Sequence, residues 1–137
     1  MRYVIDASMA AAWLLPEQHS DAVEGLIAQV TGELPVPSLF WHETRNVLLM
    51  AERRGRIAEG EAAVAMMRLR RLPLTDAGPG QDKKVLALAA EEHLTAYDAA
   101  YLELALDSQL PLATLDRKLA GAARNRNVAV VGPLSST

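Results

Sequence analysis

Short apolar runs alternate with longer segments of helical periodicity along the chain. Four runs have the length and composition of strands, at residues 3–5, around Val36, at 111–115 and at 128–131, and a weaker one covers 72–74. Helical spacing is found at residues 22–30, 41–54, 59–72, 83–93, 98–106 and 117–124, and in an Ala- and Leu-rich stretch after Ser8. Proline and glycine fall between these segments. The alternation predicts an α/β fold, with a central parallel sheet of four to five strands flanked by helices.

Size and composition favour one globular unit. Half of the 137 residues are hydrophobic and 23% are charged, which is ordinary for a soluble protein, so we expect a single domain over residues 1–137. The absence of cysteine excludes disulfide frameworks and thiol nucleophiles, and is compatible with a cytoplasmic location. The first apolar stretch is interrupted at Asp6 and closed at Pro16, so we expect neither a signal peptide nor a transmembrane segment.

Charge is distributed unevenly. A net charge of −3 argues against a nucleic-acid partner, because phosphate binding depends on Lys and Arg. Between residues 45 and 71, however, seven arginines accompany three glutamates, a local charge of +4 that leaves −7 for the rest of the chain. This pattern predicts either a basic flank for RNA beside an acidic pocket or solubilising arginines on helix surfaces. The arginines considered as RNA contacts are Arg45, Arg53, Arg54 and Arg56.

Two aspartates follow predicted strands. Asp6 ends the run YVI, and Asp116 follows the run PLATL; a helical segment begins soon after each. Ligands of parallel sheets bind outside the carboxyl ends of the strands, so the two acids could face one crevice. An Asp in front of a helix is also a preferred N-cap, which offers a purely structural interpretation of both.

Two further acids lie on predicted helices. Asp98 stands three residues after Thr95, the spacing of a capping box, yet it also shares a face with Tyr101 and other apolar residues. Glu43 suits the dipole at the start of a helix, and shares a stripe with Val47, which would direct it inward. An inward carboxylate needs a partner.

Four acids in one pocket would need a cation. Two carboxylates about 4 Å apart repel by roughly 4 kcal/mol at an effective dielectric near 20. Protonation or a bound cation must relieve this repulsion. Mg²⁺ and Mn²⁺ prefer oxygen ligands, keep several waters, and often bind a few carboxylates together with a substrate phosphate. The pattern therefore favours a metal-dependent phosphodiesterase, in which the metal aligns a water and stabilises developing charge.

At these residues the chain resembles the PIN-domain family, and within it the VapC-type toxins of toxin–antitoxin pairs. The resemblance covers essentially the whole chain. It depends on VIDAS, with Asp6; on PSLFWHETRNVL, with Glu43; on LTAYDAAYLELAL, with Asp98; and on LATLDRKL, with Thr114 and Asp116. Such proteins have a parallel sheet flanked by helices and are Mg²⁺- or Mn²⁺-dependent endoribonucleases. The resemblance thus implies a single PIN-like nuclease domain that cleaves cellular RNA and so restrains translation and growth.

The resemblance also assigns roles to individual residues. Asp6, Asp98 and Asp116 would bind Mg²⁺, or Mn²⁺, directly or through water, and Glu43 would hold or activate the water on the metal. Ser8 and Thr114 would be hydroxyls that orient carboxylates, although a helix-start hydroxyl and an ordinary strand threonine are the alternative interpretations. For both residues, a functional and a purely structural interpretation therefore stand side by side.

Partners are implied in the same way. PIN-domain proteins of this type commonly form homodimers, and the helical hairpin at residues 41–72 offers apolar side chains for such a contact or for plain core packing. These side chains are Val47, Leu48, Met50, Val64, Met66, Met67 and Leu69. A cognate antitoxin would lay an extended or helical segment into the groove and direct an arginine at the acids.

Two other functions compete with the nuclease. A phosphate-accepting receiver domain also combines a parallel sheet with an acidic pocket, but Asp6 has no acidic neighbour and no lysine follows Val131. A non-catalytic PIN-like module that only binds RNA or a protein would have a broken acid set, whereas all four acids are present.

Other candidate sites carry less chemistry. His19, His42 and His93 are too scattered for a metal motif, and no glycine-rich motif indicates a nucleotide cofactor. Trp13 and Trp41 are expected to pack in the core rather than stack on bases.

Overall fold

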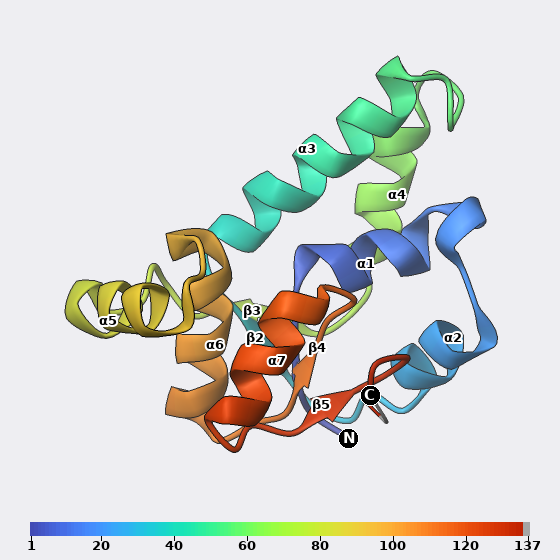
Figure 1. Ribbon diagram of the computed structural model, residues 1–137. Coiled ribbons are helices and arrows are strands. Elements are labelled where there is room, and N and C mark those ends of the chain that lie inside the picture. Colours follow the sequence, from blue (N-terminus) through green and yellow to red (C-terminus); the bar gives the residue numbers. More distant parts are fainter. Residues whose placement is uncertain (136–137) are drawn as a thin grey trace.

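The computed structural model describes residues 1–135, so the predicted domain 1–137 extends two residues beyond the described part. The strands are β1 (Val4–Ile5), β2 (Leu34–Val36), β3 (Leu74–Asp76), β4 (Leu112–Ala113) and β5 (Val130–Val131). The helices are α1 (Ala7–Leu14), a short 3-10 turn η1 (Pro16–Gln18), α2 (Asp21–Ala28), α3 (Leu39–Arg53), α4 (Glu61–Leu69), α5 (Asp82–Glu92), α6 (Ala96–Ser108) and α7 (Arg117–Asn125). The predicted α/β class and the alternation of strands with helices are confirmed (Figure 1).

The strands are all parallel, but their hydrogen bonds divide them into two sheets. One has the order β1-β4-β5, with Val4 opposite Leu112, and the other pairs β2 with β3. β2 packs beside β1 without a ladder. The reason lies in Pro35. Leu34 and Val36 direct their backbone bonds to the β3 side, so Pro35 faces the other edge and has no N–H to donate there.

Helices cover the sheets and define one end of the molecule. α6 packs against β1, β2 and β4, and α7 packs against β5 and α6. α1 contacts α2, α3 and α4, and the α3–α4 pair projects from the body as a hairpin (Figure 1). In the described part of the chain, no helix has the length and apolarity needed to cross a membrane.

The core owes its close packing to small side chains on the central helices. α1 buries nearly its whole length, including Met9, Ala10 and Ala12, and α6 buries Tyr101 and Leu102. Alanine lets a helix axis approach the sheet closely, so these helices are held firmly by apolar burial of about 25 cal/mol per Å². The first turns of α1 and α6 therefore have fixed positions beside the ends of β1 and β4.

Candidate active site

Asp6 and Asp116 lie beyond the carboxyl ends of two hydrogen-bonded strands. β1 pairs directly with β4, as the crevice hypothesis requires. Asp6 caps α1, since its Oδ1 accepts the Met9 N–H at 2.9 Å, and Asp116 caps α7, since its Oδ1 accepts the Lys118 and Leu119 N–H groups at 2.9 and 3.1 Å. The capping interpretation is thus correct for both. It does not compete with a role in a site, because capping places each carboxylate at the positive end of a helix.

Two hydroxyl groups join the strand ends around Asp6. Ser8 Oγ donates to Asp6 Oδ1 at 2.7 Å, and Thr114 Oγ1 donates to Asp6 Oδ2 at 2.5 Å. The backbone orients both hydroxyls, since the Leu115 N–H donates to Ser8 Oγ and the Asp116 N–H donates to Thr114 Oγ1, each at 3.0 Å. Each Asp6 carboxylate oxygen thus accepts a hydrogen bond from a hydroxyl group that a backbone N–H orients, so the carboxylate is held in one orientation.

Glu43 reaches the same region from α3. It shares a partly buried stripe with Val47, as its spacing predicts, and its Oε1 accepts a hydrogen bond from the Tyr101 hydroxyl of α6 at 2.6 Å. The spacing of apolar residues predicts Tyr101 on a buried face, but it does not predict this contact. A signal existed: a tyrosine buried on that face needs an acceptor for its hydroxyl, and Glu43 needs a donor.

Asp98 is the common neighbour of the other three acids. It lies in the first turn of α6, where the Thr95 hydroxyl caps the helix by accepting the Asp98 N–H at 3.1 Å. The charge of Asp98 acts on both Asp6 and Glu43, and the charge of Asp116 acts on Asp98. The fold therefore brings the other three predicted acids within electrostatic reach of Asp98, from the starts of α1 and α7 and from α3 (Figure 1).

Burial raises the pKa values of Asp6, Glu43 and Asp98. Asp6 is only 4% exposed, and burial lifts its pKa to about 6 despite the hydrogen bonds from Thr114, Ser8 and the Met9 N–H, with a further rise from the Asp98 charge. Burial also raises the pKa of Glu43 and of Asp98, and neighbouring carboxylates raise both further. Ionising the whole group in the absence of a cation is thus unfavourable.

The chain itself supplies little positive charge here. Lys118 lies close enough to lower the pKa of Asp98, but none of the four acids forms an ion pair within residues 1–135. In the same range no three His, Asp or Glu side chains are close enough to form a ready-made metal cage. The possible metal ligands are all carboxylate oxygens, and their negative charge is largely uncompensated. This chemistry fits a hard divalent cation that retains water ligands.

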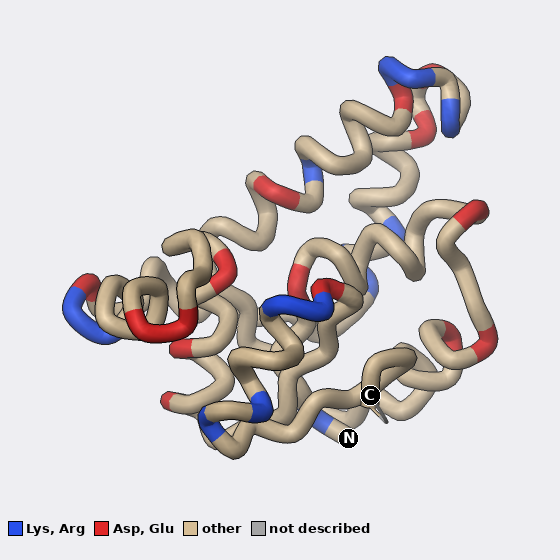
Figure 2. Tube along the Cα trace, in the orientation of Figure 1, with Lys and Arg blue, Asp and Glu red and all other residues tan. Residues whose placement is uncertain are grey.

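The arginines considered as RNA contacts are not equivalent. Arg45 donates its Nε–H to the Trp41 carbonyl at 3.1 Å, and Arg56 is ion-paired with Glu17. Arg53 and Arg54 are exposed. Basic segments gather at the turn between α3 and α4, away from the body of the molecule (Figure 2). Arg56 is therefore occupied within the chain, while its two neighbours are accessible.

The remaining sequence predictions have mixed outcomes. The three histidines are exposed, as expected. Trp13 is buried and Trp41 is partly buried, so both pack as expected. The guanidinium carbon of Arg68 lies 4.2 Å from the centre of the Trp13 ring, and that of Arg70 lies 4.2 Å from the centre of the Trp41 ring. In the α3–α4 hairpin, the residues proposed for a dimer contact range from buried to exposed, and Val47, Met50 and Met66 are partly buried. Val64 and Met67 are 62% and 66% exposed, whereas Leu48 and Leu69 are completely buried.

Comparisons with known proteins agree with this architecture. A family model described as the PIN domain matches residues 3–125. The chain is 36% identical over 124 residues to Ribonuclease VapC3 of Pyrobaculum aerophilum, covering 88% of this chain and 93% of that protein. The solved structure of PAE2754 from Pyrobaculum aerophilum is similar, with a TM-score of 0.62, 29% identity, and coverage of 89% of this chain and 87% of that chain. A toxin–antitoxin complex from Klebsiella pneumoniae shares the fold, with a TM-score of 0.62, 17% identity, and coverage of 87% and 91%.

Proposed function

The chain belongs to the PIN domain family, and from this premise we propose that it is a Mg²⁺-dependent endoribonuclease, the toxin of a toxin–antitoxin pair. The one observation that carries the proposal is the convergence of Asp6, Glu43, Asp98 and Asp116 from four separate segments, with no ion pair to any of them among residues 1–135. The pKa values of Asp6, Glu43 and Asp98 are raised. Repulsion of this kind persists in a fold when a ligand relieves it in use.

Divalent metal would be held by the carboxylates around Asp98. Asp6, Asp98 and Asp116 are the ligands, directly or through water, and Mg²⁺ or Mn²⁺ suits their oxygen chemistry. The ion would supply Lewis acidity for the phosphodiester and charge compensation for the acids. Ser8 and Thr114 orient Asp6, so that one carboxylate faces the ion in a fixed direction.

Glu43 is the base in this proposal. Its Oε1 accepts a hydrogen bond from the Tyr101 hydroxyl, and burial raises its pKa, which improves it as a proton acceptor. A water that attacks the phosphodiester would lose its proton to the Glu43 carboxylate, while the P–O bond to the leaving ribose oxygen breaks and that oxygen takes up a proton from solvent. The geometry that Tyr101 imposes then fixes the direction from which the water is deprotonated.

RNA would approach along the face that carries the acids, between the body and the α3–α4 hairpin. Arg53 and Arg54 at the hairpin turn are exposed and available to phosphates, whereas Arg56 is paired with Glu17. Such contacts would add affinity that does not depend on sequence. The RNA would then be positioned by backbone contacts and cut where the acids meet it.

The partners proposed are a cognate antitoxin and a second copy of the chain, acting in the cytoplasm. Similarity to a toxin–antitoxin complex supports the antitoxin, whose arginine could compensate the four acids when no metal is bound. The exposed Val64 and Met67 of α4 support a homodimer contact on the hairpin.

RNA cleavage by two acid-to-amide variants tests the proposal. Asp98→Asn and Asp6→Asn remove a charge with little change in shape, so we expect folded proteins whose Mg²⁺-dependent cleavage falls by about a thousandfold or more. Asp82→Asn, an exposed acid in the first turn of α5, is the matched control and should cleave at the wild-type rate. Wild-type cleavage by either site variant would refute the assignment of the site.

A further inference from the structure

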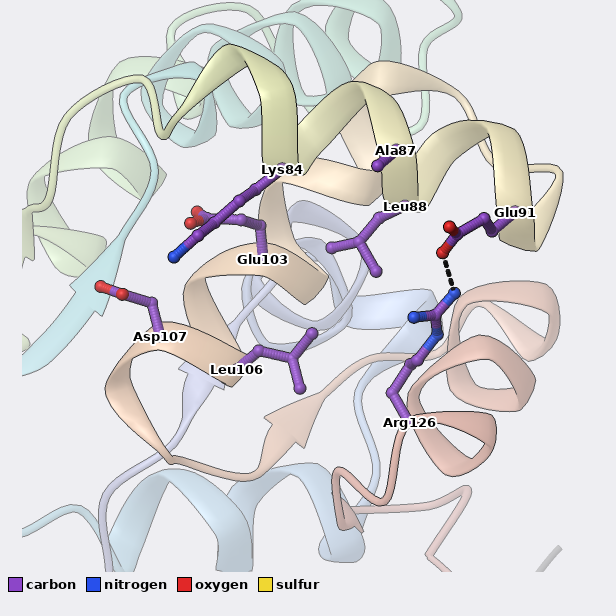
Figure 3. Close-up of a pocket in the computed structure, with 8 residues that line it drawn as sticks. All are labelled: Lys84, Ala87, Leu88, Glu91, Glu103, Leu106, Asp107 and Arg126. Carbon is purple, nitrogen blue, oxygen red and sulfur yellow. Dashed lines mark hydrogen bonds and ion pairs between the residues drawn. The ribbon is translucent and has the colours of Figure 1, made fainter.

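A groove of about 450 Å³ lies between α5 and α6, and none of the four active-site acids lines it (Figure 3). Leu88 from α5 and Leu106 from α6 form its apolar part, and Leu106 is 37% exposed. At one end Arg126, which follows α7, donates to Glu91 at 2.6 Å and to Glu92 at 2.8 Å. The charge at this end is therefore balanced within the chain.

The other end of the groove holds an acid without a hydrogen-bond partner. Glu103 is only 6% exposed, and its carboxylate oxygens, which still reach solvent, form neither a hydrogen bond nor an ion pair with any residue in the range 1–135. Asp107 lies one helical turn further on and lines the same groove. Burial raises the pKa of Glu103, and the Asp107 charge raises it further.

The loop before α5 closes over this carboxylate. Gly80 has a φ of +83°, and a Cβ at that position would lie 3.2 Å from Glu103 Oε2. A side chain there would be strained and would crowd the carboxylate, so glycine leaves the space that Glu103 occupies. The site is thus built from both sides: a buried acid on α6 and a loop that accommodates it.

Lys84 indicates which kind of group the site accepts. Its aliphatic stem extends from α5 across the groove toward the gap between Glu103 and Asp107 (Figure 3). The ammonium lowers the pKa of Glu103, but it forms no ion pair with either acid within the described residues. The groove therefore accommodates an ammonium beside the two acids, while the Glu103 carboxylate has no hydrogen-bonded cation among the described residues.

We propose that this groove binds an organic cation, a guanidinium or primary ammonium on an aliphatic stem, with the cation at Glu103 and Asp107 and the stem on Leu88 and Leu106. A charge-assisted hydrogen bond would compensate the buried carboxylate, and the stem would cover the exposed part of Leu106. Two sources share this chemistry: a Lys or Arg side chain of a partner protein, and a free amine such as a polyamine.

Agmatine, followed by amide chemical shifts in a titration of the full chain, tests the site. We expect saturable shifts confined to α5, α6 and the Gly80 loop, and affinity that falls about tenfold or more in Glu103→Gln, since one charge-assisted bond is lost. Lys84→Met keeps the stem but removes the competing ammonium, so it should bind agmatine more tightly than wild type. Asp82→Asn on α5 should bind like wild type.

Several outcomes would overturn the proposal. These are no saturable shift with agmatine, equal affinity in Glu103→Gln, and equally strong binding of hexanol, which has the stem but no charge. If Glu103→Gln does not fold, the exposed Asp107 carries the test, and Asp107→Asn must weaken agmatine by about threefold or more. An acetylated, amidated Ala-Leu-Arg-Ala peptide separates the two sources: tighter binding than agmatine assigns the site to a partner's side chain, and weaker binding to a free amine.

Discussion

Two acidic regions of the molecule balance their charge in different ways. At the end of α5, Glu92 accepts hydrogen bonds from Asn125 and Arg126, and Glu91 accepts one from Arg126. These contacts hold the pKa of Glu92 below its usual range and that of Arg126 above it. Around Asp98 the acids receive hydroxyl and backbone N–H donors instead, and no cation of the described residues pairs with them.

The difference separates carboxylates whose charge is neutralised within the chain from carboxylates that are oriented but still charged. Neutral donors orient a carboxylate without cancelling its charge, so Asp6 and Glu43 are fixed in place and still repel Asp98. The Arg126 guanidinium both orients and neutralises the carboxylates of Glu91 and Glu92, so these two acids need no metal ion to balance their charge.

Removal of the Tyr101 hydroxyl should have the largest effect on catalysis among these changes. Tyr101→Phe leaves the ring packed but takes away the donor to Glu43, so we expect RNA cleavage to fall by roughly 10–100-fold. Loss of the donor raises the pKa of Glu43 further, which moves the acid limb of the pH–rate profile to higher pH. Asn125→Ala removes a donor to Glu92 in the other region and should leave both the rate and the profile unchanged.

Stability should depend on pH with opposite signs in the two regions. Because the folded pKa of Asp6 is about 6 and its ordinary value is 3.8, the folded state binds the proton more tightly, and stability rises as the pH falls through 6. In EDTA the free energy of unfolding should increase by about 1.4 kcal/mol from pH 7.5 to pH 5 through Asp6. Glu92 has a lowered pKa, so its contribution is present above its ordinary pKa and is lost at lower pH.

Urea unfolding at several pH values separates these contributions. Asp6→Asn should flatten the gain in stability between pH 7.5 and 5, because the burial of a charge is no longer relieved by protonation. Glu92→Gln should leave that gain in place. A wild-type protein that loses stability through Asp6 over this range would contradict the burial of an uncompensated charge.

The α3–α4 turn should contribute the smallest effect. Arg53→Gln with Arg54→Gln removes two exposed charges, and the slope of log affinity for single-stranded RNA against log salt should fall by about 1.4. Arg56→Gln should change the slope less, since Arg56 already pairs with Glu17. Filter binding over a range of salt concentrations measures both, and an unchanged slope in the double variant would move the RNA path elsewhere.

Much of the fold could be predicted because local pattern and topology agree. Asp6 and Asp116 were placed at strand ends from the order of apolar runs, and the pairing of β1 with β4 makes them neighbours. The division of the strands into two sheets was not predicted. It depends on which edge Pro35 faces, and that follows from the direction of β2 relative to β1 and not from hydrophobic periodicity.

Contacts between distant segments explain what the sequence analysis missed at the sites. Tyr101 and Glu43 are 58 residues apart, and neither a period nor a motif pairs two such residues. Glu103 lies within a helix that was predicted from its apolar residues, and no pattern singled it out. Only the packing of α5 and the Gly80 loop shows that this residue is buried. Arg56 looked like its exposed neighbours until its pairing with Glu17 was visible.

The most direct test of the proposed metal site is the effect of Mg²⁺ on the free energy of unfolding in variants of the two regions. At about pH 7.5, a few millimolar MgCl₂ should raise the free energy of unfolding of the wild type and of Glu92→Gln, and should give a saturable calorimetric isotherm. Asp98→Asn should lose most of both signals. Equal stabilisation of Asp98→Asn and wild type by Mg²⁺, or none in either, would contradict the metal site.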